Sequence, residues 1–401
     1  MKNQPWSIQQ RDHAMARGAH QSATDYADFV RDEMGDLIEQ GYWVALPYHQ
    51  VRHLPNLRIS PMGVVPQRDR RPRIIVDYTF SGVNADTVPL APLEAMQFGK
   101  ALHRLMRQLV EADPRHGPVY MCKVDIADGF YRIPLRDEDI PNLGVVLPVS
   151  PGENPLVAFP LTLPMGWLSS PPYFCTATET VADIANDNIR NRQSGSRHRL
   201  EEAASTILFP SAPVPTIPLP PPPNHHPIQQ PYHHHHRRAP LRSIDVYIDD
   251  FLGLSQGCAR RRDEVRRTLF NTLDTVFRPL QIHDGPHRKE PISIKKLLKG
   301  DGAWATDKVM LGWHIDSVQG TIALPPHRRE RLEQILRSIH PNQHRIGLRT
   351  WQQVIGELRS MLLGIPGGQG LFCHIQHALK HSDRHRVRLS RHVHAALNDF
   401  R

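Results

Sequence analysis

The sequence predicts an α+β fold, and three observations support this class. Residues 243–254 contain two short runs rich in β-branched and aromatic residues on either side of Asp249 and Asp250, which is the pattern of a β-hairpin with acidic residues at its tip. Several other stretches carry apolar residues at helical spacing and so predict amphipathic helices. A chain of 401 residues is also long enough for several subdomains with a buried core.

The adjacent Asp249 and Asp250 have two interpretations on this pattern alone. Neighbouring carboxylates repel each other, and aspartate is a poor strand former, so another interaction must offset their presence. An acidic surface turn is one explanation, because turns favour aspartate. A bound divalent cation is the other, because hard cations such as Mg²⁺ take carboxylate oxygens and relieve the repulsion.

Two stretches further upstream favour the cation. Residues 122–135 place Asp125 at the end of a predicted strand and Phe130 five positions later, and residues 163–174 place Gly166 in a loop. In this order the three stretches resemble the palm motifs of reverse transcriptases, with residues 247–250 (Tyr-Ile-Asp-Asp) as the signature hairpin. The resemblance is greatest to the polymerases of retroviruses and retrotransposons, and it runs from about residue 55 to about residue 380.

The resemblance implies a right-hand polymerase, with fingers, a palm whose antiparallel sheet is backed by helices, and a thumb. The expected parts are an N-terminal extension (1–54), fingers (55–118), the first part of the palm (119–190), a disordered Pro/His-rich insertion (191–242), the second part of the palm with the catalytic hairpin and primer grip (243–320), and a helical thumb or connection (321–401). No protease, RNase H or integrase motif is present in the sequence, so the chain resembles a polymerase core from a larger polyprotein without RNase H.

Helices are predicted where apolar residues recur on one face, at 25–40, 99–112, 171–187, 261–277, 326–339 and 350–363. The side chains expected to face the core include Tyr26, Val30 and Met34 in the first helix, Leu102, Leu105 and Val110 in the second, and Phe174, Val181 and Ile184 in the third. Strands are expected around residues 73–77, before Asp125, on both sides of Asp249, and in a further hairpin at 310–316.

The segment 191–242 breaks this pattern. Residues 210–240 contain 11 prolines, and histidines occupy positions 233–236. Proline-rich sequence of this kind builds no core, so the segment is expected to be disordered and to loop out of the palm. Its histidine run is a weak candidate for binding a transition metal, and its prolines for docking a partner.

The composition indicates a polyanionic partner. The chain has 49 Lys and Arg against 40 Asp and Glu, and residues 321–401 hold 13 of the basic residues but only 5 of the acidic ones. Cysteines 122, 175, 258 and 373 show no metal-ligand spacing and are predicted to be reduced and buried. The sequence has neither a membrane span nor a secretory signal, which predicts an intracellular protein, cytoplasmic or nuclear.

The resemblance also implies a catalytic centre. Asp125, Asp249 and Asp250 would hold two Mg²⁺ ions, with Mn²⁺ as an alternative, and the carbonyl of Ile126 would add a ligand. The residues implied in nucleotide binding are Arg73, Asp128, Gly129, Phe130, Met165 and Gly166. Those implied in gripping the primer are Leu311, Gly312 and Trp313.

Several of these roles have a physical reason. A guanidinium at Arg73 suits the phosphates of an incoming nucleotide because its planar fork bonds two oxygens at once, and Arg68, Arg70 and Arg71 are looser candidates. Phe130 matches the aromatic gate that leaves no room for a 2′-hydroxyl, although an aromatic side chain there also suits a core. Met165 departs from the family, which more often has Gln or Phe, and it cannot give the nucleotide the hydrogen bond of a glutamine. Lys295 or Lys296 is a candidate proton donor to pyrophosphate.

The implied function is template-directed DNA synthesis, an RNA-directed nucleotidyltransferase reaction that adds dNTPs to the 3′-hydroxyl of a primer on an RNA or DNA template. One alternative is a decayed or domesticated retroelement fragment that only binds nucleic acid; the intact aspartates weigh against it, and the insertion and missing domains weigh for it. A second alternative is an RNA-templated RNA polymerase, which Phe130 and the fingers motif disfavour.

Overall fold

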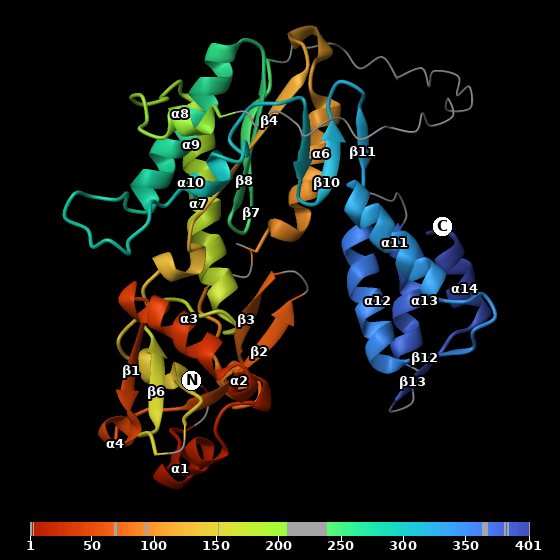
Figure 1. Cartoon of the computed structure of the whole chain (residues 1–401). Helices are drawn as coiled ribbons and strands as arrows, with labels where there is room; N and C mark the ends of the chain where they lie inside the picture. The colour runs from red at the N-terminus through yellow and green to blue at the C-terminus, as the bar shows by residue number, and fades with distance from the viewer. Residues whose placement is uncertain are drawn as a thin grey trace.

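A three-stranded antiparallel sheet lies at the centre of the chain in the computed structural model (Figure 1). The structure describes residues 2, 4–67, 70–91, 94, 96–150, 152–206, 239–362, 368–380, 382 and 385–400. In the central sheet the strand order is β4-β8-β7, with β4 (Val119–Asp125), β7 (Arg242–Tyr247) and β8 (Asp250–Gln256). The hairpin predicted from residues 243–254 is therefore formed by β7 and β8.

The turn of this hairpin is as short as a hairpin turn can be. Tyr247 pairs with Asp250, which leaves only Ile248 and Asp249 between the strands. Ile248 has a φ of 58°, and a β-branched residue in this left-handed region costs about 1–2 kcal/mol. The outer edge of β7 is occupied by a side chain, because the amide group of Asn186 both donates to the Ile244 carbonyl (2.7 Å) and accepts from the Ile244 amide (2.9 Å).

Both faces of the central sheet are covered. One face packs on α7 (Ser170–Arg190) and α9 (Ala259–Val276), through a core that includes Val246 and Phe251. The other packs on α6 (Ala101–Glu111) and on a second antiparallel sheet of order β11-β10-β9, through a core that includes Met121 and Leu252. The strands of the second sheet are β9 (Asp307–Met310), β10 (Trp313–Asp316) and β11 (Thr321–Ala323).

The N-terminal part of the chain builds a separate five-stranded sheet of order β1-β6-β5-β2-β3. Its strands are β1 (Trp43–Pro47), β2 (Ile59–Gln67), β3 (Arg70–Val76), β5 (Gly144–Val146) and β6 (Leu156–Pro160). Only the β2–β5 pair is parallel; the other neighbours are antiparallel. The helices of this part are α1 (Ile8–Arg17), α2 (Gln21–Asp25), α3 (Ala27–Glu39), α4 (Tyr48–Val51) and α5 (Val83–Asp86).

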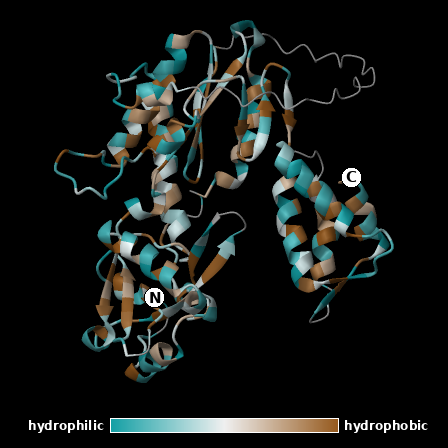
Figure 2. Ribbon diagram, viewed as in Figure 1, coloured by the Kyte–Doolittle hydropathy of each residue, from teal (hydrophilic) through white to brown (hydrophobic). Residues whose placement is uncertain are grey.

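The C-terminal part is mainly helical and has its own core around the fully buried Trp351. It consists of α11 (Pro326–Ser338), α12 (Leu348–Met361), α13 (Gly368–Lys380) and α14 (Arg391–Asn398), with a two-stranded sheet of β12 (Arg345–Gly347) and β13 (Arg386–Arg388). Figure 2 shows hydrophobic and hydrophilic residues alternating along these helices. Arg328 of α11 donates to the Gly312 carbonyl at 2.7 Å and so connects this part to the turn between β9 and β10.

Short elements complete the described fold. They are α8 (Glu201–Ala204), α10 (Ile294–Leu297) and the 3-10 helices η2 (Phe98–Lys100), η3 (Pro114–His116), η4 (Gly129–Arg132) and η5 (Ile140–Leu143). No helix among the described residues is long and apolar enough to cross a membrane.

Some sequence predictions were wrong in detail. The helix expected at 25–40 is interrupted at Tyr26, whose backbone leaves the helical region, so α2 and α3 are separate. Val110 is 80% exposed and Ile184 is 37% exposed, because each lies at the margin of the apolar stripe of its helix. Cys122 and Cys175 are buried as predicted, but Cys258 and Cys373 are exposed, which spacing along the sequence cannot reveal.

The first part of the predicted insertion belongs to the fold. Helix α8 lies within residues 191–206, where no regular structure was expected, and Leu200 and Ala204 are buried in the same core as α7 and α9. Glu201 forms an ion pair with Arg267 of α9 at 2.7 Å. The proline-rich pattern that suggested disorder begins only at residue 210, so the boundary at 191 was placed too early. Residues 207–238 lie outside the described residues.

We expect Leu200→Ala to lower the free energy of unfolding by about 2 kcal/mol, because it removes a buried side chain from the main core. Chemical denaturation of the two proteins would measure this. Leu298→Ala is the matched control, since Leu298 is 50% exposed and its truncation should cost much less. If both changes have equal and small effects on the free energy of unfolding, residues 191–206 are not part of the main core.

Candidate active site

The structure brings together the three aspartates singled out in the sequence. Asp125 is the last residue of β4 and lies directly opposite Asp250, the first residue of β8. Asp249 is in the hairpin turn, and its carbonyl oxygen accepts a hydrogen bond from the Ile126 amide at 3.1 Å. The end of β4 is held from the other side as well, because the Asp125 carbonyl accepts from the Ser293 amide at 2.8 Å.

Asp125 and Asp250 share a face of the sheet with a lysine. Side chains alternate along a strand, so both carboxylates lie on the side of Met121 and Leu252, opposite α7 and α9. The ammonium of Lys123 is 3.6 Å from Asp250 Oδ1. The ammonium of Lys296, in α10, is 2.5 Å from Asp125 Oδ1.

The carboxylates at this site have fewer hydrogen-bond donors around them than their negative charge requires. Burial raises the pKa of Asp125 to about 7, and the Asp250 carboxyl beside it adds to this increase. Burial and then the charge of Asp250 also raise the pKa of Asp249. Asp250 Oδ1 is buried and accepts no hydrogen bond within the described part of the chain. A cation placed among these groups would stabilise their charged forms.

The donor set fits a hard divalent cation such as Mg²⁺, which prefers carboxylate oxygens. As the side chains lie, however, no group of three or more His, Cys, Asp or Glu among the residues described is arranged to hold a metal ion. Asp249 lies in the turn and not in the strand ladder, next in the chain to Asp250. The structure therefore offers a paired carboxylate site with a third acid next to it.

The chain makes a tight turn immediately after Asp125. Asp128 has a φ of 56° and a ψ of 37°, in the left-handed region, and it caps the 3-10 helix η4. Its carboxylate pairs with the ammonium of Lys289 at 2.9 Å and accepts from the Tyr42 hydroxyl at 3.4 Å. These contacts offset part of the strain of a non-glycine residue in this conformation.

Gly129 and Phe130 pack against one aromatic ring of α7. A β-carbon on Gly129 would lie 2.7 Å from Cζ of Phe174, so only glycine fits at this position. The ring of Phe130 is half-buried, and its centroid is 4.8 Å from that of Phe174. Phe130 is thus supported from below by the core, which is compatible with either a gate or a core role.

Three of the residues predicted to bind a nucleotide line one pocket of about 390 Å³. They are Arg73 from β3, Asp128 and the 44% exposed Met165, and the pocket also includes Lys289 and Tyr131. The side chain of Arg73 makes no hydrogen bond or ion pair with the described residues, whereas that of Arg71 is engaged with Glu33 at 2.9 Å. Arg68 and the side chain of Arg70 lie outside the described residues. Arg73 is therefore better placed than Arg71 to meet a phosphate group.

The loop that carries Met165 and Gly166 is fastened to the N-terminal part of the chain. Gly166 has a φ of 96°, and a β-carbon there would lie 2.7 Å from the Val76 carbonyl oxygen. Asn84 donates to the Gly166 carbonyl at 3.1 Å and accepts from the amide of Leu168 at 2.8 Å. The loop is thus held against the strand that presents Arg73.

The predicted primer-grip residues form the turn between β9 and β10. Leu311 and Gly312 have φ values of 50° and 79°, as expected for a two-residue hairpin turn. Trp313 is only 4% exposed and belongs to the core beneath the central sheet. The turn itself, and not the Trp313 ring, is what this hairpin presents to its surroundings.

Sequence reasoning missed Lys123 and Lys289. Lys123 is adjacent to a recognisable motif, but only the pairing of β4 with β8 shows that it faces Asp250. Lys289 is more than 150 residues from Asp128 in the sequence, and no local pattern links the two. Of the two lysines considered as proton donors, the structure places Lys296 beside Asp125, and Lys295 is exposed.

No family model and no curated protein matches the sequence. Among solved structures, the chain is similar to the foamy viral protease-reverse transcriptase, in its dRH form with double-stranded DNA (14% identity, TM-score 0.53), with an RNA/DNA hybrid (14%, 0.53) and with double-stranded DNA (16%, 0.53). These matches cover 95%, 94% and 93% of this chain but only 47%, 36% and 56% of the viral chains.

The chain therefore has a reverse-transcriptase-like fold and spans about half the length, or less, of the solved chains that it matches. At these identities the similarity concerns the fold alone.

We expect Gly166→Ala to destabilise the protein by about 1–3 kcal/mol, because it adds backbone strain and a clash with Val76 at the same residue. Gly356→Ala is the control: Gly356 lies inside α12 with no atom in the way, so alanine should stabilise by about 0.5–1 kcal/mol. Thermal unfolding of both variants measures the difference. A Gly166→Ala protein as stable as the wild type would mean that this loop is not constrained as described.

Proposed function

We propose that this protein is a template-directed DNA polymerase of the reverse-transcriptase type, which adds dNTPs to a primer 3′-hydroxyl. The observation that carries the proposal is the pairing of Asp125 with Asp250 beside Asp249, with too few donors for their charge. The pocket that contains Arg73 and Lys289 is a candidate place for a triphosphate, and Asp128 in its lining follows Asp125 by three residues. The reverse-transcriptase-like fold supports the same conclusion.

Asp125, Asp249, Asp250 and the carbonyl of Ile126 are the groups that would hold Mg²⁺, or Mn²⁺ in its place. Two such ions, when bound, lower the pKa of the primer hydroxyl and neutralise the triphosphate. In this proposal, Arg73 and Lys289 supply the additional positive charge that the triphosphate needs. Arg73 is the more available of the two, because Lys289 already pairs with Asp128.

Lys296 is the proposed proton donor to the leaving pyrophosphate. Its ammonium lies beside Asp125, close to the proposed reacting groups. The Lys296 side chain is 44% exposed, so solvent can return the proton that it donates. Lys123 lies two residues before Asp125 in β4. Its side chain is 19% exposed and pairs with both Asp250 and Asp301. We assign Lys123 the role of balancing and orienting the Asp250 carboxylate.

Sugar selection is assigned to Phe130, whose position is fixed by its contact with Phe174. The ring follows the turn at Asp128, and its chain neighbours Asp128 and Tyr131 line the pocket that contains Arg73. An aromatic ring held there would exclude a 2′-hydroxyl. Template and primer are assigned to the turn at Leu311 and Gly312 and to the basic C-terminal part of the chain.

We expect Asp249→Asn to abolish primer extension on an RNA template in the presence of Mg²⁺, while template-primer affinity changes less than about twofold. The amide keeps the shape of the side chain but removes the negative charge that the cation needs. Gel-based extension and fluorescence anisotropy measure the two properties. Asp183→Asn is the control, because Asp183 is exposed on α7 and should affect neither. A wild-type protein that binds template-primer without extending it would instead favour the nucleic-acid-binding alternative.

We expect Phe130→Val to raise the use of ribonucleotides relative to deoxynucleotides by about tenfold or more, because the smaller side chain opens space below the sugar. The ratio of kcat/KM for the two nucleotides is the measurement, and it is insensitive to a general loss of folded protein. Phe277→Leu is the control, since it disturbs the same aromatic cluster at its other end, where Phe277 packs against Phe174. An unchanged ratio in Phe130→Val would make Phe130 a core residue only.

A further inference from the structure

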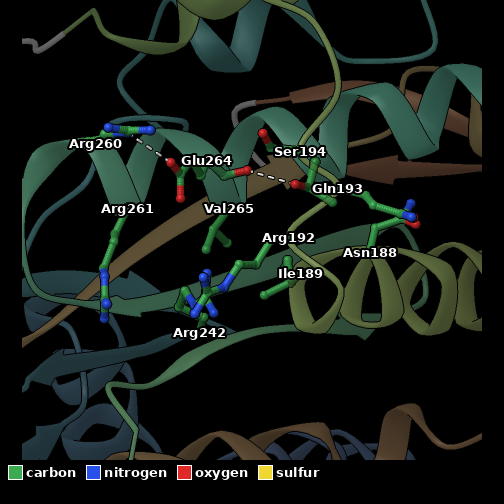
Figure 3. A pocket seen from close by; sticks show the side chains of 11 residues that line it. Asn188, Ile189, Arg192, Gln193, Ser194, Arg242, Arg260, Arg261, Glu264 and Val265 are labelled. Carbon is green, nitrogen blue, oxygen red and sulfur yellow. Dashed lines mark hydrogen bonds and ion pairs between the residues drawn. The ribbon is translucent and has the colours of Figure 1, made fainter.

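A pocket of about 410 Å³ lies between the end of α7, the start of β7 and the first turns of α9 (Figure 3). Four arginines line it: Arg192, Arg242, Arg260 and Arg261. Among the described residues that line it, Glu264 is the only one with a carboxylate. The pocket therefore has a clear excess of positive charge.

The arginines differ in how far their charge is already balanced. Arg260 pairs with Glu264 at 3.1 Å, and in Figure 3 this pair is drawn together. Arg192, Arg242 and Arg261 have no ion pair with any residue that the structure describes. Arg192 and Arg242 both line this pocket, and neither is balanced by an ion pair with a described residue (Figure 3). Like charges in one pocket repel each other, and a bound anion would relieve this repulsion.

The backbone under Arg192 makes this placement more costly. Helix α7 ends with the amide of Gln193 bonded to the Asn188 carbonyl (2.8 Å) and the amide of Arg192 bonded to the Ile189 carbonyl (3.3 Å). In this ending the left-handed position is normally taken by glycine, yet here it is Arg192, with a φ of 59°. An arginine in place of glycine costs about 1 kcal/mol or more and brings a cation into the pocket.

Helix α9 adds to the positive potential. Its first turn contains Arg260 and Arg261 and no acidic residue, although the amino end of a helix carries a partial positive charge that disfavours cations. By contrast, Arg262 is occupied elsewhere, bonded to the Gly257 carbonyl at 3.1 Å and placed over the Tyr120 ring at 3.8 Å. Glu264 alone cannot balance the remaining charge.

The pocket is separate from the candidate active site. Arg242 alternates with the buried Ile244 and Val246, so it lies on the α7/α9 face of the central sheet, whereas Asp125 and Asp250 lie on the opposite face. Arg242 and Tyr247 are at opposite ends of β7, about 17 Å apart along the strand. A ligand in the pocket would therefore not occupy the site assigned to the incoming nucleotide.

We propose that Arg192, Arg242 and Arg261 form a phosphate-binding pocket for the backbone of a nucleic-acid strand, away from the catalytic carboxylates. Guanidinium groups bind phosphate oxygens two at a time, and three of them from three different elements suit consecutive phosphates better than one small ion. The chain does not supply the anion from the adjoining segment, since residues 207–238 contain no Asp or Glu and end in two arginines. This binding does not depend on polymerase activity.

The test measures the affinity of the full chain for a fluorescein-labelled single-stranded RNA of 30 nucleotides, by anisotropy, in EDTA and without dNTPs, over a series of salt concentrations. The variant is Arg192→Gly with Arg242→Gln and Arg261→Gln. We expect its affinity to fall about tenfold or more. The slope of the logarithm of the association constant against the logarithm of the salt concentration should become less steep by about 2, because each lost phosphate contact to a single strand removes about 0.7. Because catalysis is not measured, failure of the polymerase assignment does not affect the result.

The matched control removes three arginines that are already paired outside the pocket, by Arg107→Gln, Arg190→Gln and Arg197→Gln. It changes the net charge equally, so equal losses in both triple variants would overturn the pocket as a specific site. Arg192→Gly alone guards against misfolding: we expect an unfolding temperature no lower than that of the wild type, with weaker RNA binding. Unchanged RNA binding in this variant and in the triple variant would overturn the proposal.

A final arm separates nucleic acid from small phosphates. Pyrophosphate is added to the wild type and to the triple variant, and thermal unfolding is followed. We expect stabilisation of the wild type only at concentrations far above those at which RNA binds. The opposite outcome is that pyrophosphate binds the wild type as tightly as RNA does, or more tightly. If the triple variant then loses this binding but keeps its RNA binding, the assignment to a nucleic-acid strand is overturned.

Discussion

The register of β4 against β8 is the constraint on which the rest of the site depends. It sets Asp125 opposite Asp250 and, through the same alternation, puts Lys123 on the same face. A slip of one residue would send the Asp250 carboxylate to the α7/α9 face and would bury Leu252 and Leu254 against the wrong neighbours. The two cores that enclose the sheet therefore fix the position of the acids, although neither core contributes a charged group.

The central sheet keeps like charges together on both of its faces. On one face, carboxylates approach each other and are partly balanced by Lys123 and Lys296. On the other, four arginines line one pocket, in which Glu264 is the one carboxylate among the described lining residues. Both arrangements reduce the stability of the isolated protein, and both become favourable when a ligand of opposite charge is present. Clusters of like-charged side chains that repel each other in the absence of a ligand are typical of binding and catalytic sites.

Much of the site was predictable because it is encoded in short stretches. The strand that ends at Asp125, the hairpin at Asp249 and the position of Gly166 in a loop all follow from short local patterns. What could not be predicted depends on contacts between distant segments. The pairing of Lys289 with Asp128 and the exposure of Val110 belong to this group.

Residues 191–206 show why composition is a poor guide to boundaries. The proline-rich composition that predicts disorder belongs to the segment that follows, but the prediction was applied to residues 191–206 as well. Leu200 and Ala204 supply little signal in sequence, because a single i, i+4 pair in a polar stretch is too short to establish helical periodicity. Their burial becomes evident only when α9 presents Arg267 to Glu201.

The two hydrogen bonds between the Asn186 side chain and the Ile244 backbone have a consequence for the chain that leads into β7. The side-chain amide stands in for a missing neighbouring strand, so β7 is aligned from within the helix that precedes it and not by the chain that leads into it. The length and sequence of that incoming chain therefore have little leverage on the position of the aspartates. The same amide also closes an edge to which another copy of the protein could otherwise add a strand. One asparagine thus anchors the hairpin independently of the proline-rich stretch that precedes it.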